Sequence, residues 1–209
     1  MQIKNNFLAI FFLLFFIPIL NLNADEFNIT AKEIFIDKDN EIIRGEGSVE
    51  AIDSSGKIIK SDKIVYEKKR GFLISQGNVE ISDLNGNILK ANKATYDETK
   101  EVINTFGKTE VNLKEGYKLS SKNITYNVKE REMSSSNKSI FTDEDKNYIE
   151  TSMFNYYIEN NLFSSVGKIK IIDANKNKYF FKELHVDTKK KRNCWFKCKR
   201  SFRSKYLWS

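Results

Sequence analysis

The chain has 209 residues, with 35 basic side chains against 28 acidic ones and a formal net charge of +7. Nine of the basic residues lie within Lys189–Lys205, whereas the segment Asp25–Thr188 carries 25 basic and 28 acidic side chains. A nucleic-acid-binding face needs basic residues clustered on the folded part of a protein, so the positive net charge does not indicate that function.

The N-terminal segment, residues 1–24, has the pattern of a secretory signal peptide. Lys4 precedes an apolar run of 14 residues from Phe7 to Leu20, and the small residue Ala24 comes directly before the acidic Asp25. Because this run is shorter than the roughly 20 residues that span a bilayer, we expect cleavage after residue 24. An uncleaved membrane anchor is the alternative. The mature chain is then an exported protein.

Residues 25–188 are predicted to form one domain, because they repeat with a period of 30 residues. Five full copies and half of a sixth are present. A column that contains Gly47, Gly77, Gly107, Asn137 and Gly167 predicts a recurring position with positive φ. The apolar columns comprise Ile36, Tyr66, Tyr96, Tyr126, Tyr156 and Val186; Ile29, Ile59, Leu89, Leu119, Ile149 and Tyr179; Ile43, Leu73, Ile103, Met133 and Phe163; and Ala51, Ile81, Val111, Phe141 and Ile171.

Each unit predicts two strands joined by turns rich in Asp, Asn, Gly and Lys. In the second unit the strands are Ile59–Glu67 and Phe72–Ser82, and alternation places Ile64 and Tyr66 on one face. A change of phase between Ile59 and Ile64 predicts a β-bulge near Ser61–Lys63. Two turn clusters per unit favour two sheets that face each other across an open apolar groove, with a closed three-sided β-helix as the alternative.

The repeat resembles a known family. Leu89-Lys-Ala91-Asn-Lys-Ala94-Thr-Tyr96 and Gly77-Asn-Val79-Glu-Ile81 are similar to the OstA-like repeat of lipopolysaccharide-transport proteins, which occurs in LptA and in the N-terminal domain of LptD. The similarity covers roughly residues 27–187. It implies an all-β fold, an open two-sheet β-jellyroll (β-taco-like) solenoid in the periplasm, whose apolar interior shields acyl chains of lipopolysaccharide.

The inward columns fit either a closed, dry core or a lipid groove, and the resemblance favours the groove. Burial of acyl methylenes needs a continuous apolar surface, which the stacked columns provide. The predicted lipid-groove residues are Ile34, Ile36, Ile64, Tyr66, Leu73, Val79, Ile81, Ala94, Tyr96, Ile103, Val111, Ile124, Tyr126, Met133, Phe141, Phe154, Tyr156, Phe163 and Ile171.

The sequence does not indicate catalysis, a cofactor or a metal site. The one histidine, His185, is predicted to point outward between Glu183 and Asp187. No nucleophile, base and acid occur in a catalytic pattern, and Cys194 and Cys198 supply too few ligands for zinc. We therefore expect a binding protein rather than an enzyme.

The two ends of the stack are predicted to be exposed edges, near Ile29–Asp37 and near Tyr179–Asp187. An exposed edge strand is a template for pairing with another strand, so other transport components or further copies of the chain are the expected partners. From Lys189 onward the repeat fails. The tail, residues 189–209, is interpreted as unstructured or as a non-native reading frame, with contact to an anionic membrane as the alternative.

The function predicted from these features is that of a periplasmic lipid-binding bridge that carries lipopolysaccharide toward the outer membrane, with possible outer-membrane association. Either a free-standing LptA-like protein or a truncated LptD fits. Two alternatives remain: an exported structural solenoid with a dry core that acts only as an interaction module, and a β-helix enzyme acting on carbohydrate. The sequence lacks the cluster of carboxylates on one strand face that such an enzyme would need.

Overall fold

The structure, a computed structural model, describes residues 27–114 and 116–188. The predicted signal peptide and the predicted tail lie outside the described residues, so the domain limits stay predictions. Within the described residues, no helix is long and apolar enough to cross a lipid bilayer.

The described chain is almost entirely β-structure, as the alternating apolar pattern predicts. A single 3-10 turn, η1 (Lys68–Arg70), joins two of the long strands. The strands are β1 (Asn28–Thr30), β2 (Glu33–Asp37), β3 (Ile42–Ile52), β4 (Ile58–Glu67), β5 (Phe72–Ser82), β6 (Ile88–Asp97), β7 (Val102–Asn112), β8 (Lys118–Lys122), β9 (Thr125–Asn127), β10 (Glu132–Ser135), β11 (Ser139–Thr142), β12 (Tyr148–Thr151), β13 (Phe154–Tyr157), β14 (Leu162–Ile172) and β15 (Lys178–Asp187).

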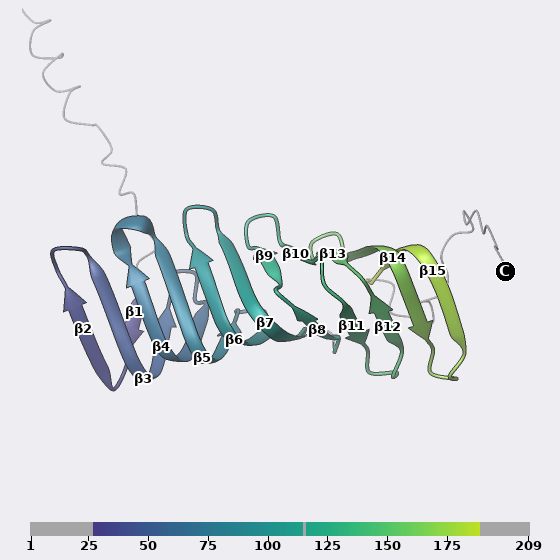
Figure 1. The fold of residues 1–209 in the computed structure, drawn as a ribbon, viewed down its shortest axis with the longest axis horizontal. Helices are drawn as coiled ribbons and strands as arrows, with labels where there is room; N and C mark the ends of the chain where they lie inside the picture. The colour runs from purple at the N-terminus through teal and green to yellow at the C-terminus, as the bar shows by residue number, and fades with distance from the viewer. Residues whose placement is uncertain (1–26, 115, 189–209) are drawn as a thin grey trace, which may run out of the picture.

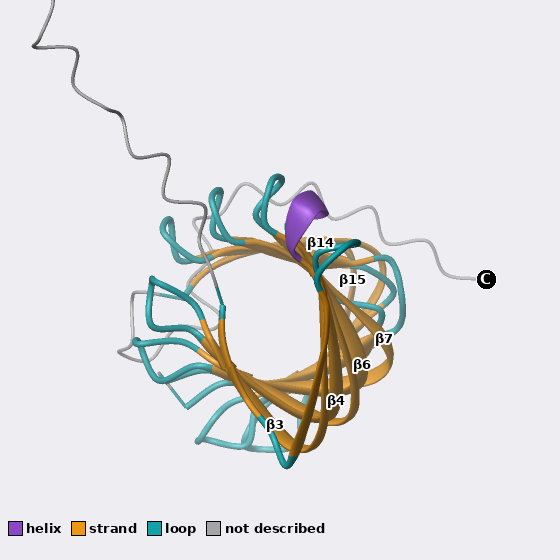
Figure 2. Ribbon diagram, turned by 90° about the vertical axis from the view of Figure 1, so that its left-hand side faces the viewer, coloured by secondary structure: helices purple, strands orange, loops and turns teal. Residues whose placement is uncertain are grey.

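The described strands form one 15-stranded sheet in which the paired strands are antiparallel. Successive units lie side by side along the long axis of the molecule, with two rows of turns above and below them in Figure 1. We call these rows the upper turns (residues 38–41, 68–71, 98–101, 128–131 and 158–161) and the lower turns (residues 53–57, 83–87, 113–114 with 116–117, 143–147 and 173–177). Seen along the long axis, the strands curve into a ring (Figure 2).

The predicted open two-sheet β-jellyroll solenoid is wrong. The hydrogen-bonded order β7–β8–β11–β12–β14–β13–β10–β9 returns to β7, so that eight of the described strands form a closed antiparallel barrel with flanking strands. The ring closes because the strands of the middle units are each broken into two halves. β8 and β9 both pair with the long strand β7, and β12 and β13 both pair with the long strand β14. β7 and β14 continue through the break. The alternation of apolar and polar residues predicts which face of the sheet a residue lies on, but it does not predict that the hydrogen-bonded strands close into a ring.

Side-chain hydroxyl groups form hydrogen bonds with the backbone where the middle strands break. The Ser121 hydroxyl lies 2.7 Å from that of Ser139 and 3.1 Å from that of Ser135, and the Ser135 hydroxyl donates to the carbonyl of Lys122. In the next units Thr151 and Ser165 form a hydrogen bond with each other. A buried carbonyl that loses its partner in the sheet needs another hydrogen-bond donor. These hydroxyl groups supply it, which reduces the cost of the strand break.

The predicted bulge is confirmed, since the register between β4 and β5 shifts between Lys60 and Lys63. Gly77 lies opposite this shift with φ +75°, a conformation that other residues adopt at a cost. The positive φ that the column predicts is not found at Asn137, which lies in the break between β10 and β11.

Replacing Gly77 with alanine is expected to destabilise the protein more than replacing Gly107. Both glycines have positive φ, a strain of about 1 kcal/mol for alanine. A Cβ on Gly77 would clash with the carboxylate of Asp62, whereas a Cβ on Gly107 would meet nothing within 4 Å. Urea denaturation of the two variants measures the difference. Equal losses of stability would show that Asp62 moves aside without cost.

Candidate functional site

Two continuous apolar ladders line the inner face of the sheet. In an antiparallel pair, directly opposite residues lie on the same face, so the strand register identifies them. The upper ladder, next to the upper turns, consists of Ile36, Ile43, Tyr66, Leu73, Tyr96, Ile103, Tyr126, Met133, Tyr156, Phe163 and Val186. The lower ladder consists of Ile29, Ala51, Ile59, Ile81, Leu89, Val111, Leu119, Phe141, Ile149, Ile171 and Tyr179.

These ladders run the length of the described sheet. With strands spaced about 4.8 Å apart, each ladder is about 50 Å long. The outer face carries charges instead, for example in the ion pairs of Lys60 with Glu50 (3.1 Å) and of Lys90 with Glu80 (2.9 Å). The molecule therefore has an apolar inside and a charged outside along its whole length.

Most of the predicted lipid-groove residues lie in the buried core. Tyr126 is half-buried and packs against it. Ile34 and Ile36, on the edge strand β2, are instead 43% and 62% exposed. The predicted residues in the core are Ile64, Tyr66, Leu73, Val79, Ile81, Ala94, Tyr96, Ile103, Val111, Ile124, Met133, Phe141, Phe154, Tyr156, Phe163 and Ile171.

Several inner residues are missing from the predicted set. Val49 and Ile169 are buried, and the 30-residue period relates them to Val79, so the repeat could have found them. Phe27 could not be found in this way. Its ring lies 5.4 Å from that of Tyr66 and 6.1 Å from that of Tyr96, where it fills the interior near the N-terminal end.

The upper and lower turns meet along a seam, which closes the interior where an open groove was expected. The Tyr117 hydroxyl, in a lower turn, lies 3.5 Å from the carbonyl oxygen of Thr188, which follows β15. Near the other end, Lys57 Nζ of a lower turn lies 4.3 Å from the ring centroid of Tyr96, at the upper end of β6. These contacts join residues that are far apart in the sequence.

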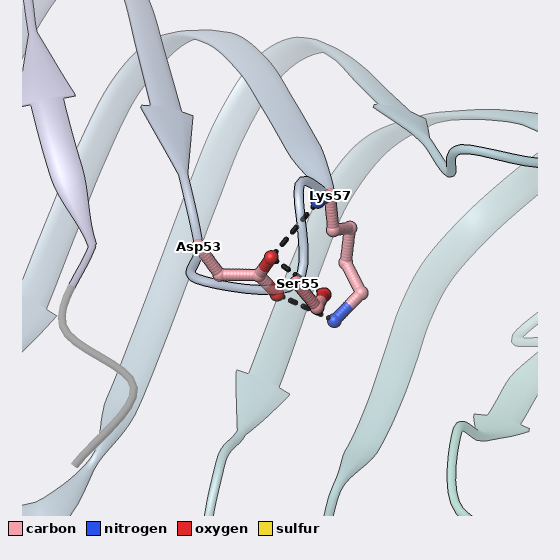
Figure 3. A network of polar contacts seen from close by, with 3 residues as sticks. All are labelled: Asp53, Ser55 and Lys57. Carbon is pink, nitrogen blue, oxygen red and sulfur yellow. Dashed lines mark hydrogen bonds and ion pairs between the residues drawn. The ribbon is translucent and has the colours of Figure 1, made fainter. Parts of the chain in front are cut away.

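A buried ion pair lies on this seam (Figure 3). Lys57 Nζ donates to a carboxylate oxygen of Asp53 at 2.9 Å, and both side chains are less than a tenth exposed. The other carboxylate oxygen accepts hydrogen bonds from the Ser55 hydroxyl at 2.7 Å and from the Lys57 backbone N–H at 2.8 Å. The carboxylate is thus paired and hydrogen-bonded, which a buried charge requires.

The pair holds both groups in their charged forms. Burial by itself raises the pKa of the Asp53 carboxyl, but the hydrogen bonds from Lys57 and Ser55 outweigh burial and leave this pKa below its usual value. Burial likewise opposes the charge on Lys57, yet the contacts with Asp53 and Tyr96 raise the pKa of its ammonium group. Burial raises the pKa of the Tyr96 hydroxyl, so the tyrosine beneath the ammonium is neutral.

A hollow of about 370 Å³ lies on the outer face beside the bulges of β5 to β7. Its charged side chains are paired with one another, Lys90 with Glu80 and Lys108 with Glu110 at 2.7 Å. His185 is exposed as predicted and lies 3.0 Å from Glu183. Within residues 27–114 and 116–188, no three His, Cys, Asp or Glu side chains are grouped so as to hold a metal ion.

Comparison with known proteins gives a structural similarity. No family model and no curated protein matches the sequence. The chain is similar in structure to LptH. LptH is the LptA-homologous periplasmic component of the lipopolysaccharide transport device of Pseudomonas aeruginosa, and the match has 14% identity and a TM-score of 0.44 over 49% of this chain and 76% of that one. LptH is described as a component of the same kind of transport system as the family that the repeat resembles.

A second match is with the TCP10 domain of Danio rerio CPAP, solved in complex with a peptide of STIL. It has 10% identity and a TM-score of 0.15 over 75% of this chain and 99% of that one. Identities and scores at these levels do not transfer a function.

Proposed function

We propose that the chain is a periplasmic lipid-binding protein that carries lipopolysaccharide toward the outer membrane. The observation that carries this proposal is the pair of unbroken apolar ladders on the inner face, together with the OstA-like pattern of the repeat. Burial of each acyl methylene contributes about 0.8 kcal/mol, so a chain of about a dozen carbons gains about 10 kcal/mol on a continuous apolar surface.

The acyl chains enter, in this proposal, at the N-terminal end of the sheet. Ile34 and Ile36 lie on the inner face at the edge strand β2, and they are the exposed members of columns whose other residues are buried or half-buried. β2 belongs to the flanking strands, which lie outside the closed eight-strand ring. An apolar surface that runs inward from an exposed end is a suitable entry for a lipid.

The two edges supply the contacts with partners. Among the described strands, β2 pairs with β3 and β15 pairs with β14, so each has one side without a described neighbour. Addition of a strand from another transport component, or from a second copy of the chain, would extend the apolar ladders from one molecule to the next. Association with the outer membrane would follow from such a partner.

Photo-crosslinking from β2 tests the proposal. Ile36 and Phe35 are neighbours that are 62% and 54% exposed and that point to opposite faces of the sheet. With benzoylphenylalanine at position 36, lipopolysaccharide is expected to be crosslinked in cells, whereas position 35 serves as the matched control and is expected to give little lipid product. Equal crosslinking from both positions, or none from either, would contradict a lipid-binding inner face.

The second candidate is an interaction module with a dry core, and the burial of the ladders favours it. Tyr66, Leu73 and Ile103 are each only 1% exposed, and the seam closes the interior. In that case position 36 is expected to crosslink to protein alone, because the exposed apolar residues of β2 would then contact a partner strand.

A further inference from the structure

A slot of about 170 Å³ lies on the seam, between the middle lower and upper turns. Its volume is below the range of about 300–1,000 Å³ that is typical of pockets for drug-sized ligands, so it fits one small group rather than a whole lipid. The residues that line it are Asn85, Asn87, Leu113, Lys114, Arg131, Tyr156 and Ile158.

The slot contains two cations without an acidic partner. Arg131 is half-buried and Lys114 is exposed, and neither forms an ion pair with another residue of the described ranges 27–114 and 116–188. The adjacent carboxylate, that of Asp83, accepts hydrogen bonds from the backbone of Asn85 and Asn87 at 2.9 Å and from the Asn87 side chain at 2.8 Å. The slot is therefore lined by two cations that form no described ion pair and by amide groups, with the Asp83 carboxylate beside them.

These two cations depart from the repeat. The residues one period before and after Lys114 are Leu84 and Glu144. Arg131 occupies a position of positive φ where the preceding unit has Glu101 and the following unit has Asn161. Since the other units fold with acidic or neutral residues here, the fold itself does not require a cation at either position.

The slot lies directly over the upper ladder, because Tyr156 lines the slot and also belongs to that ladder. Burial raises the pKa of the hydroxyl of Tyr126, the ladder residue one period earlier; the charges of Arg131 and Lys57 oppose this rise, and the charge of Asp83 adds to it. Arg131 thus lies at the seam close to the apolar ladder, with the Asp83 carboxylate nearby.

We infer that the slot binds a phosphate group of a phosphorylated lipid, with Arg131 and Lys114 as its ligands. This inference rests on the proposed function and specifies the substrate class, an anionic lipid whose acyl chains lie along the ladders. Arg131 presents a planar fork of N–H donors that suits phosphate oxygens, and Lys114 adds a point charge from the facing turn. The two come from turns 17 residues apart in sequence, so an anion between them would also hold the seam closed.

Calorimetric titration with short-chain lipids tests the inference. The probes are dihexanoyl phosphatidic acid, dihexanoylglycerol with the same acyl chains but no phosphate, and glycerol phosphate without acyl chains. The phosphorylated lipid is expected to bind at least about tenfold more tightly than the neutral lipid, because charge-assisted hydrogen bonds are lost without the phosphate. The double substitution Lys114→Glu and Arg131→Glu is expected to abolish this preference.

The substituted chain is expected to fold, since Glu144 and Glu101 occupy the same positions in other units. The matched control is Arg44→Glu with Lys129→Glu, which changes the net charge equally at exposed cations outside the slot.

Equal binding of both lipids to the natural chain, or a preference that survives in the slot variant, would overturn the inference and leave the proposed function intact. Failure of both lipids to bind would overturn the proposed function as well. Binding of glycerol phosphate as tight as that of the lipid would assign the slot to a soluble phosphate and refute the lipid.

Discussion

Replacing Phe154 with alanine is expected to lower the free energy of unfolding by about 3–5 kcal/mol. The Phe154 side chain is 1% exposed, and its ring lies 4.9 Å from that of Phe141 and 6.2 Å from that of Phe163. The loss of the ring removes its buried apolar area and leaves a cavity between strands β11, β13 and β14, which the closed ring of hydrogen bonds prevents from collapsing. Urea denaturation followed by circular dichroism measures the change.

The matched control is Phe106→Ala, on the outer face of β7. Phe106 is 46% exposed, and its ring lies 5.3 Å from Lys93 Nζ, so its removal is expected to cost less than about 1 kcal/mol. In a repeat protein the damage can be confined to neighbouring units. A smaller m-value together with a lower midpoint would report such partial unfolding. Similar losses for the two variants would show that the aromatic cluster around Phe154 is not tightly packed.

Much of the local structure was predictable from the repeat. Strand β5 has the predicted limits Phe72–Ser82, and the bulge near Ser61 follows from the phase change between Ile59 and Ile64. The reason is that alternation and turn residues are local signals, and five copies in register repeat each signal. The buried faces of Ile64 and Tyr66 were predictable for the same reason.

The closure of the fold was not predictable in this way. It depends on strand breaks at the hydroxyl network of Ser121, Ser135 and Ser139, and on seam contacts such as that of Tyr117 with Thr188, 71 residues away. Serine at these positions reads as an ordinary polar residue, and the period gives no information on how far the sheet curves. The slot at Arg131 was not predictable from the repeat, because it is formed by residues that depart from the repeat.

Replacing Lys57 with methionine is expected to lower the free energy of unfolding by about 3–5 kcal/mol, because the buried Asp53 carboxylate would lose its cation. The matched variant is Lys57→Asn. In three other units the equivalent pair is Asp with Asn, as in Asp83 and Asn87, where the side-chain amide donates to the carboxylate at 2.8 Å. The asparagine variant is therefore expected to retain most of the stability. Thermal or urea denaturation of both variants near neutral pH measures the difference.

The dependence on pH distinguishes loss of the ion pair from loss of packing. In the natural chain the folded-state pKa of Asp53 lies below its ordinary value of 3.8, so the stabilisation is complete above that value and is lost as the pH falls through the folded-state pKa. With methionine at position 57, burial without a cation raises the folded-state pKa of the carboxyl. Asp53 then destabilises the variant at neutral pH, and protonation relieves this on acidification. The deficit of the methionine variant relative to the asparagine variant is expected to shrink between about pH 7 and about pH 4. A deficit that stays constant over this range would assign the effect to packing against Tyr96 instead of to the buried charge.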